Sequence, residues 1–166
     1  PGGLRWTYAD LQARANRIAN VLVNDMGLVP GNRVLLSAPN NPMLAAAWFG
    51  VIKAGGIAVA TMPLLRAMEL KPVIAKAQIT HALCDLRLAT ELKLAVAEQP
   101  VLQHIRYFND PGPDSLEAAM ARQPATFTNV ATAADDTCIL AFTSGTTGVP
   151  KATMHFHRDV MASCVC

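Results

Sequence analysis

The sequence predicts an α/β fold in which a mostly parallel sheet is covered by helices. Short apolar segments of strand length alternate along the chain with longer segments of helical periodicity, the order that βαβ units produce. The 166 residues are 52% hydrophobic and 16% charged, which is enough to bury a core in one domain and too apolar for a disordered chain. No internal repeat or low-complexity linker interrupts this order, so we expect one compact unit.

The first predicted helix covers residues 7–26. Thr7 is its expected N-cap, Asp10 stands at the third helical position as in a capping box, and Gly27 fits the C-terminal end. Apolar residues recur at helical spacing at Leu11, Ala15, Ile18, Leu22 and Met26.

A second helix is predicted from Asn41, which caps it, to the glycine pair at residues 55–56. Pro42 stands at its first position, where a missing backbone N–H breaks no helical hydrogen bond. Its nearly continuous apolar sequence predicts a helix buried almost all round. Three further helices are predicted at residues 64–77, 87–98 and 115–122. In the first of these, Pro72 either kinks the helix or marks its true start.

The predicted strands are short apolar segments bounded by turn residues. They cover residues 33–37, 57–61, 80–84, 104–108 and 137–142. Residues 109–114 are rich in proline and aspartate and are expected to form a surface loop. Ligands in parallel sheets bind beyond the carboxyl ends of the strands, so the loop that follows Phe142 is expected at the ligand-binding edge.

That loop lies in the sequence LAFTSGTTGVPK, residues 140–151, and has the chemistry of a phosphate-binding loop. Its glycines allow close backbone approach to a ligand, its hydroxyl groups and successive N–H groups can donate to phosphate oxygens, and its lysine adds a positive charge. The predicted ATP/phosphate-binding residues are Thr143, Ser144, Gly145, Thr146, Thr147, Gly148 and Lys151.

The spacing of this loop differs from that of a Walker loop, which has Lys and Ser/Thr directly after its second glycine and then opens a helix. Here Pro150, which lacks an N–H, precedes Lys151, and residues 152–156 have the composition of a strand. We therefore expect strand, loop and strand. A helix beginning at Lys151 would instead favour a Walker-type NTPase or kinase module, and a hairpin turn that binds nothing is the structural alternative.

Residues 143–151 resemble the phosphate-loop signature of the AMP-forming adenylating enzymes, which comprise acyl-CoA synthetases, peptide-synthetase adenylation domains and luciferases. Ala152 stands where the family usually has glycine, so the following strand is expected to start with an ordinary backbone. The continuation, ATMHFHRD at residues 152–159, is similar to the benzoate and 2-aminobenzoate CoA ligases.

The resemblance implies that residues 1–166 are part of the large N-terminal, AMP-binding domain, truncated at both ends and without the small C-terminal domain. It implies an acid–CoA ligase for an aromatic acid such as benzoate or 2-aminobenzoate. Such an enzyme forms an acyl-adenylate and pyrophosphate from acid and ATP, and then a thioester with CoA. ATP, Mg²⁺ and coenzyme A are the implied cosubstrates. A peptide-synthetase adenylation domain, which loads a carrier protein, is the alternative.

The resemblance places the adenine-contacting motif, most of the acid pocket, the ribose-binding aspartate and the C-terminal lysine outside this sequence. We therefore expect no catalytic residue within it and no turnover by it alone. Glu69 lies in the first turn of a predicted helix, where a carboxylate favours the helix dipole, and is given no catalytic role. Arg33 and Arg158 are expected in surface ion pairs.

His155 and His157 are candidates for residues near the adenylate. On a strand covering residues 152–157 they would face opposite sides, so that one lines the site while the other packs elsewhere; a structural role is as strong an interpretation for each. No metal site is expected, since no other His/Cys cluster lies nearby.

Charge and cysteine content bound the partners and the compartment. A net charge of +2 with scattered basic residues does not favour nucleic acid or an anionic membrane. The uncharged residues 34–52 are broken by Pro39 and Pro42, so no membrane span is expected. The four cysteines form no paired Cys-x-x-Cys framework, which favours the reducing cytoplasm. They are Cys84, Cys138, Cys164 and Cys166, the last two expected to be buried thiols on a helix. A non-catalytic interaction domain is a further alternative, which the apolar helix could serve.

Overall fold

The computed structural model describes residues 5–143 and 150–165. Within them, six strands form one sheet in the order β4-β3-β1-β2-β5-β6, and every neighbouring pair is parallel except β5 and β6. The strands are β1 (Arg33–Ser37), β2 (Ile57–Thr61), β3 (His81–Asp85), β4 (His104–Phe108), β5 (Thr137–Thr143) and β6 (Lys151–Phe156). The predicted α/β class with a mostly parallel sheet is confirmed.

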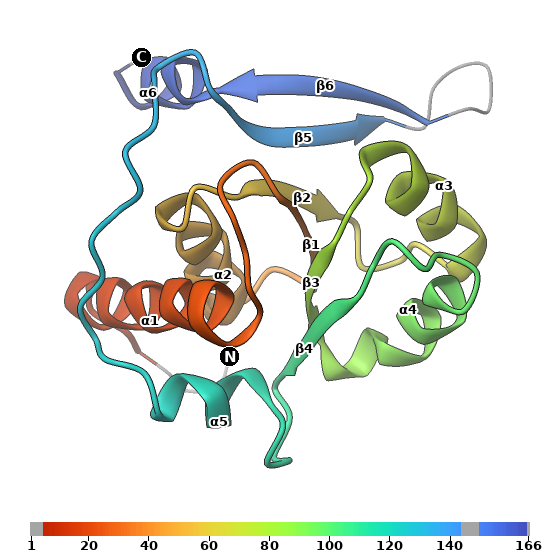
Figure 1. The fold of residues 1–166 in the computed structure, drawn as a ribbon, viewed down its shortest axis with the longest axis horizontal. Helices are drawn as coiled ribbons and strands as arrows, with labels where there is room; N and C mark the ends of the chain where they lie inside the picture. The colour runs from red at the N-terminus through yellow and green to blue at the C-terminus, as the bar shows by residue number, and fades with distance from the viewer. Residues whose placement is uncertain (1–4, 144–149, 166) are drawn as a thin grey trace.

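Helices cover both faces of the sheet (Figure 1). One face carries α1 (Tyr8–Asn20), its π-helical continuation η1 (Val21–Asp25), α2 (Pro42–Lys53) and α5 (Leu116–Ala121). The other carries α3 (Ala67–Ala77), the 3₁₀ turn η2 (Leu86–Leu88) and α4 (Ala89–Val96). The last helix, α6 (His157–Val165), follows β6. Alternate residues of β1 enter the two cores, Leu36 that of α1 and α2 and Leu35 that of α3 and α4, as expected for a strand buried on both faces.

The predicted helix starts at Thr7 and Asn41 are confirmed. The Thr7 hydroxyl accepts a hydrogen bond from the Asp10 backbone N–H at 3.1 Å, while the Asp10 carboxylate accepts one from the Thr7 N–H at 2.8 Å. The Asn41 side chain accepts from the Leu44 N–H at 2.9 Å, and Pro42 follows it. These contacts satisfy backbone donors that have no partner within the helix.

The structure corrects one helix prediction and excludes one of the two roles left open for Pro72. The helix α2 is not buried all round, because Ala45 and Phe49 lie on a face that neither α1 nor the sheet covers, and Phe49 is 42% exposed. In α3, Pro72 is not the start of the helix: the helix begins at Ala67 and carries Pro72 in its interior, at an exposed position. An exposed position tolerates the missing N–H better, since water can satisfy the carbonyl that loses its partner.

A long irregular segment, residues 123–136, carries the chain from α5 past α1 and α2 to β5 (Figure 1). Asn20 on α1 holds it through its side-chain amide, which donates to the carbonyls of Pro124 at 3.1 Å and Thr126 at 2.9 Å. Asn16 donates to the Ala125 carbonyl at 2.7 Å. Both asparagines are buried, so these bonds replace water for the segment's backbone and fix the path by which β5 reaches the sheet.

Candidate functional site

The candidate site is the hairpin made by β5 and β6. The two strands are antiparallel, and Thr143, the last residue of β5, pairs with Lys151, the first residue of β6. The predicted strand, loop and strand order is therefore confirmed. Because β6 begins at Lys151 as a strand, the Walker-type interpretation, which requires a helix there, is wrong. Five predicted phosphate-binding residues lie outside the described residues: Ser144, Gly145, Thr146, Thr147 and Gly148.

The hairpin places its lysine at the carboxyl edge of the parallel strands, the edge at which the sequence predicts ligand binding. Since β5 runs parallel to β2, the end of β5 at Thr143 lies on the same edge as the carboxyl ends of the other parallel strands. The side chains of Thr143 and Lys151 are both exposed. Within residues 5–143 and 150–165, no hydrogen bond or ion pair engages the Lys151 ammonium, so its charge is available to an anion.

A lysine that is distant in the sequence contacts the residue directly before β6. Lys76, in the last turn of α3, donates from Nζ to the backbone carbonyl of Pro150 at 2.8 Å. Figure 1 shows α3 beside the end of the hairpin at which β5 stops and β6 begins. Sequence reasoning missed this contact, because a lysine in the last turn of a helix is ordinarily explained by the helix dipole.

The two candidate histidines occupy different elements. His155 lies on β6 opposite Ile139, with Nε2 3.4 Å from the hydroxyl of Thr153, which in turn donates to the Ala141 carbonyl at 3.2 Å. His157 is the first residue of α6, because the strand ends at Phe156. The expectation that they alternate on one strand is therefore wrong. Both side chains are half-buried, and His155 remains the candidate on the hairpin itself.

A buried carboxylate lies at the same edge of the sheet, at the end of β3, and joins neighbouring loops by hydrogen bonds. Asp85 ends β3, and its side chain is fully buried. It accepts two hydrogen bonds from the Arg87 guanidinium at 2.8 Å each and one from the Asn109 amide at 2.6 Å. The Arg87 hydrogen bonds hold the pKa of Asp85 below its ordinary value. The Asn41 amide lies 3.5 Å away, so this carboxylate links the loops that follow β1, β3 and β4.

Three other charged residues predicted to be structural can now be placed. Glu69 accepts a hydrogen bond from the Arg66 backbone N–H at 2.9 Å at the start of α3, which confirms its helix-start role. Arg158 forms ion pairs with Asp135 and Asp159. The ion-pair expectation for Arg33 is wrong: its guanidinium donates to backbone carbonyls, those of Ala77 at 2.7 Å and Gly31 at 3.2 Å.

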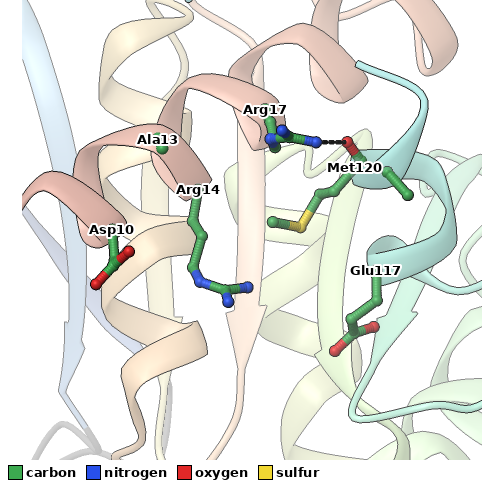
Figure 2. A pocket seen from close by; sticks show the side chains of 7 residues that line it. Asp10, Ala13, Arg14, Arg17, Glu117 and Met120 are labelled. Carbon is green, nitrogen blue, oxygen red and sulfur yellow. Dashed lines mark hydrogen bonds between the residues drawn. The ribbon is translucent and has the colours of Figure 1, made fainter. Parts of the chain in front are cut away.

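Among the cavities formed by described residues are two that do not include Thr143, Lys151, His155 or His157. One, of about 340 Å³, lies between α1 and α5 and brings Asp10, Arg14, Arg17 and Glu117 together (Figure 2). There the Arg17 guanidinium donates to the Met120 carbonyl at 3.2 Å. The other, of about 390 Å³, is apolar and lies between α2 and the end of β2, with Trp48, Phe49 and Ala60 in its wall.

The cysteine expectations are partly corrected. Cys84 and Cys138 are buried and free, and burial raises the pKa of the Cys84 thiol to about 12, so it stays neutral. Cys164 is exposed on α6, contrary to the expected burial, and Cys166 lies outside the described residues.

The part of the chain that the structure describes has no helix with the length and hydropathy to cross a bilayer. It also has no group of three or more His, Cys, Asp or Glu side chains placed to share a metal ion.

Comparison with known proteins finds a matching family model and several ligases of similar sequence. A family model described as AMP-binding enzyme matches residues 2–166. The benzoate–CoA ligase of Thauera aromatica is 30% identical over 156 residues, 94% of this chain and 30% of that protein. The salicyl-AMP ligase/salicyl-S-ArCP synthetase of Mycobacterium tuberculosis is 36% identical over 167 residues, and the match covers 95% of this chain and 28% of that protein. The long-chain-fatty-acid–CoA ligase FadD13 of M. tuberculosis is 31% identical, over 95% and 31% of the two chains.

Solved structures show the same fold. The inhibitor-bound N-terminal domain of FACL13 from M. tuberculosis superposes with a TM-score of 0.86 and 28% identity, over 95% of this chain and 39% of that one. ATP-bound MatB from Rhodopseudomonas palustris gives a TM-score of 0.83 and 29% identity, over 95% and 31%. The chain spans between 28% and 31% of the length of the three curated relatives it matches.

Proposed function

The chain belongs to the AMP-binding enzyme family, and from that premise we propose that it is part of the large N-terminal domain of an AMP-forming carboxylic acid–CoA ligase. The relatives named as CoA ligases support this reaction class. The superposition on a structure described as an N-terminal domain supports the domain assignment. On this proposal the small C-terminal domain lies outside the 166 residues.

The observation that carries the proposal is the position of Lys151. It begins β6 directly across from Thr143, at the carboxyl edge of the sheet, with an exposed ammonium that no described residue engages. We propose that the β- and γ-phosphates of ATP bind in the loop between these two residues. The proposed contacts are Thr143, Ser144, Gly145, Thr146, Thr147, Gly148 and Lys151. The ATP-bound neighbour supports ATP as the nucleotide.

In the proposed reaction the substrate carboxylate attacks the α-phosphorus of ATP, the bond to the bridging oxygen breaks, and pyrophosphate leaves with the electron pair. Negative charge accumulates on the departing phosphates, so an ammonium held beside them lowers the barrier. Mg²⁺ bound to the nucleotide would neutralise further charge. The thiol of CoA then attacks the acyl carbon, AMP leaves, and the thiol proton passes to solvent or a base. The contribution of this chain is to position and stabilise the phosphate tail.

An aromatic acid is the proposed substrate class. The relatives named for benzoate and salicylate support it, as does the similarity of residues 152–159 to benzoate and 2-aminobenzoate CoA ligases. Because one relative is named for long-chain fatty acids, aromatic acids have to be compared with fatty acids of increasing chain length as substrates. His155 is proposed to lie nearer the adenylate than His157, since it belongs to the hairpin. The proposed compartment is the cytoplasm, supported by free thiols at Cys84 and Cys138.

One relative favours a second candidate for the acceptor. The name of the salicyl-AMP ligase from M. tuberculosis includes salicyl-S-ArCP synthetase and mentions no CoA thioester. An adenylation domain that transfers its acyl group to a carrier-protein thiol would use the same hairpin and the same first step. The two candidates differ only in the thiol that attacks the adenylate.

The test uses the full-length protein with ATP, Mg²⁺ and an acid panel of benzoate, 2-aminobenzoate, salicylate and fatty acids of increasing length. We expect AMP, pyrophosphate and an aryl-adenylate with one of the aromatic acids, and a CoA thioester once CoA is added. Turnover of the adenylate only with a carrier protein would select the second candidate. Formation of ADP and inorganic phosphate, or no acid dependence, would contradict the proposed function. The isolated 166 residues are expected to release no pyrophosphate.

A further inference from the structure

The phosphate-loop hairpin has an anchor outside its own two strands. The Nζ atom of Lys76 lies 2.8 Å from the carbonyl oxygen of Pro150, and 74 positions separate the two residues. Pro150 directly precedes Lys151. A charge-assisted hydrogen bond at this place constrains the residue that leads into the lysine proposed to hold the phosphates.

Because residue 150 is a proline, its backbone offers few ways to be held, and the contact with Lys76 uses one of them. Proline has no backbone N–H, so its carbonyl is the only backbone group through which position 150 can be held by a hydrogen bond. The strand pairing that fixes β6 begins one residue later, with Thr143 opposite Lys151. The Lys76 ammonium therefore extends the fixed part of the hairpin by one residue toward the loop.

The backbone that carries Lys76 is itself well held. Val73 and Ile74, on the inner face of α3, are buried in the core that this helix shares with α4 and the sheet. The end of α3 is tied to β1, because the Arg33 guanidinium donates to the Ala77 carbonyl at 2.7 Å. An anchor on such a helix transmits position to its partner, whereas an anchor on a mobile surface element does not.

We propose that Lys76 is a positioning residue for the phosphate loop, holding Pro150 so that the Lys151 ammonium is aimed at the triphosphate. This inference rests on the proposed function, because it assigns Lys76 a part in ATP binding at the same hairpin. It predicts an effect on ligands that carry β- and γ-phosphates and none on ligands that lack them.

The experiment measures equilibrium binding of MgATP and of AMP to the full-length protein, together with KM for ATP and for the acid. Lys76→Met keeps the length of the side chain and removes its hydrogen-bond donor and its charge. Lys76→Arg keeps the donor and the charge. The matched control is Lys71→Met on the same helix, which removes a lysine that pairs with Glu98 at 2.6 Å and, among the described residues, makes no hydrogen bond to β5 or β6.

We expect Lys76→Met to weaken MgATP binding and raise KM for ATP about fivefold, the effect of losing one charge-assisted contact at an exposed site. AMP affinity and KM for the acid should stay within about twofold, and Lys76→Arg and Lys71→Met should match the wild type. Equal loss of MgATP, AMP and acid affinity would mean general structural damage and would overturn the inference. So would wild-type MgATP affinity in Lys76→Met. A wild-type protein that binds no MgATP would instead refute the proposed function itself.

Discussion

Gly50 on α2 packs against Ile18 on α1 with no room for a side chain between them. A Cβ added at Gly50 would lie 2.6 Å from Cγ2 and 2.8 Å from Cβ of Ile18, and 3.2 Å from the Ala15 carbonyl oxygen. These atoms belong to the helix backbone or lie close to it, so they cannot move away without shifting α1. The close approach of the two helices thus depends on glycine at this position.

We predict that Gly50→Ala destabilises the fold by about 1–2 kcal/mol. Overpacking by one methyl group costs about 1–3 kcal/mol, and the better helix propensity of alanine returns up to about 1 kcal/mol. Urea unfolding monitored by circular dichroism measures the difference. The control is Ala45→Val, which adds bulk on the exposed face of the same helix. Equal stability of wild type and Gly50→Ala would show that the helices have room to separate.

Asn20→Ala should destabilise the chain by about 1 kcal/mol, because it removes the buried amide that donates to the carbonyls of Pro124 and Thr126. It should also raise the rate of limited proteolysis within residues 123–136, since the side chain holds that segment against α1. Asn24→Ala is the matched control: the Asn24 amide donates to the Gln123 side chain at 3.2 Å in an exposed hydrogen bond, so its loss should change stability by less than about 0.5 kcal/mol. Unchanged cleavage in Asn20→Ala would contradict the assigned role.

The Asp85 carboxylate should make stability depend on pH in the acid range. Its pKa is lowered in the folded state, chiefly by the Arg87 hydrogen bonds, so the unfolded chain takes up a proton first as the pH falls. The stabilisation is complete above the ordinary aspartate pKa of 3.8 and is lost as the pH falls through the folded-state pKa. Asp85→Asn should remove this component and lower stability at neutral pH by about 2 kcal/mol.

Unfolding by urea at several pH values between about 3 and 7 measures this effect. The exposed Asp114→Asn is the control for a change in net charge without loss of a buried acceptor. An Asp85→Asn variant whose stability falls with acidification as steeply as that of the wild type would show that other carboxyl groups carry the dependence.

A second pH effect is expected from His81. The residue is 2% exposed, its Nε2 lies 3.0 Å from the Met26 carbonyl oxygen, and its ring stacks on His104 with centroids 4.7 Å apart. Burial is the main cause that lowers the pKa of His81, and the charge of His104 lowers it further. The unfolded chain therefore binds this proton first, and stability should fall as the pH drops from 6.5 toward the folded-state pKa.

Histidine titration by NMR tests this directly, since the His81 ring signals should shift at a lower pH than those of a histidine in the unfolded chain. His104→Gln removes the neighbouring charge and should move the His81 midpoint upward. A His81 midpoint at or above 6.5 would contradict the account.

Local signals in the sequence predict most of the elements. Thr7 with Asp10, and Asn41 with Pro42, each place backbone donors and acceptors within a few residues, so the helix starts can be read without knowledge of the fold. The strand, loop and strand order around Lys151 follows in the same way from proline and from the composition of β6.

Contacts between distant residues could not be predicted in this way. Asn20 lies more than a hundred positions from the segment it holds, and Lys76 is 74 positions from Pro150. Nothing local marks either side chain, because its role depends on which element folds beside it. The exposed face of α2 was missed for a related reason: an apolar composition indicates what a helix can bury, while the neighbouring elements decide how much it does bury.

The central claim is that Lys151, at the start of β6, binds the phosphate tail of ATP. The most direct test is the affinity of the full-length protein for MgATP and for AMP, compared between wild type and Lys151→Ala, with Lys93→Ala on α4 as the control. The account predicts that Lys151→Ala weakens MgATP binding by about tenfold or more and leaves AMP binding within about twofold. Equal MgATP affinity in the wild type and Lys151→Ala would contradict it.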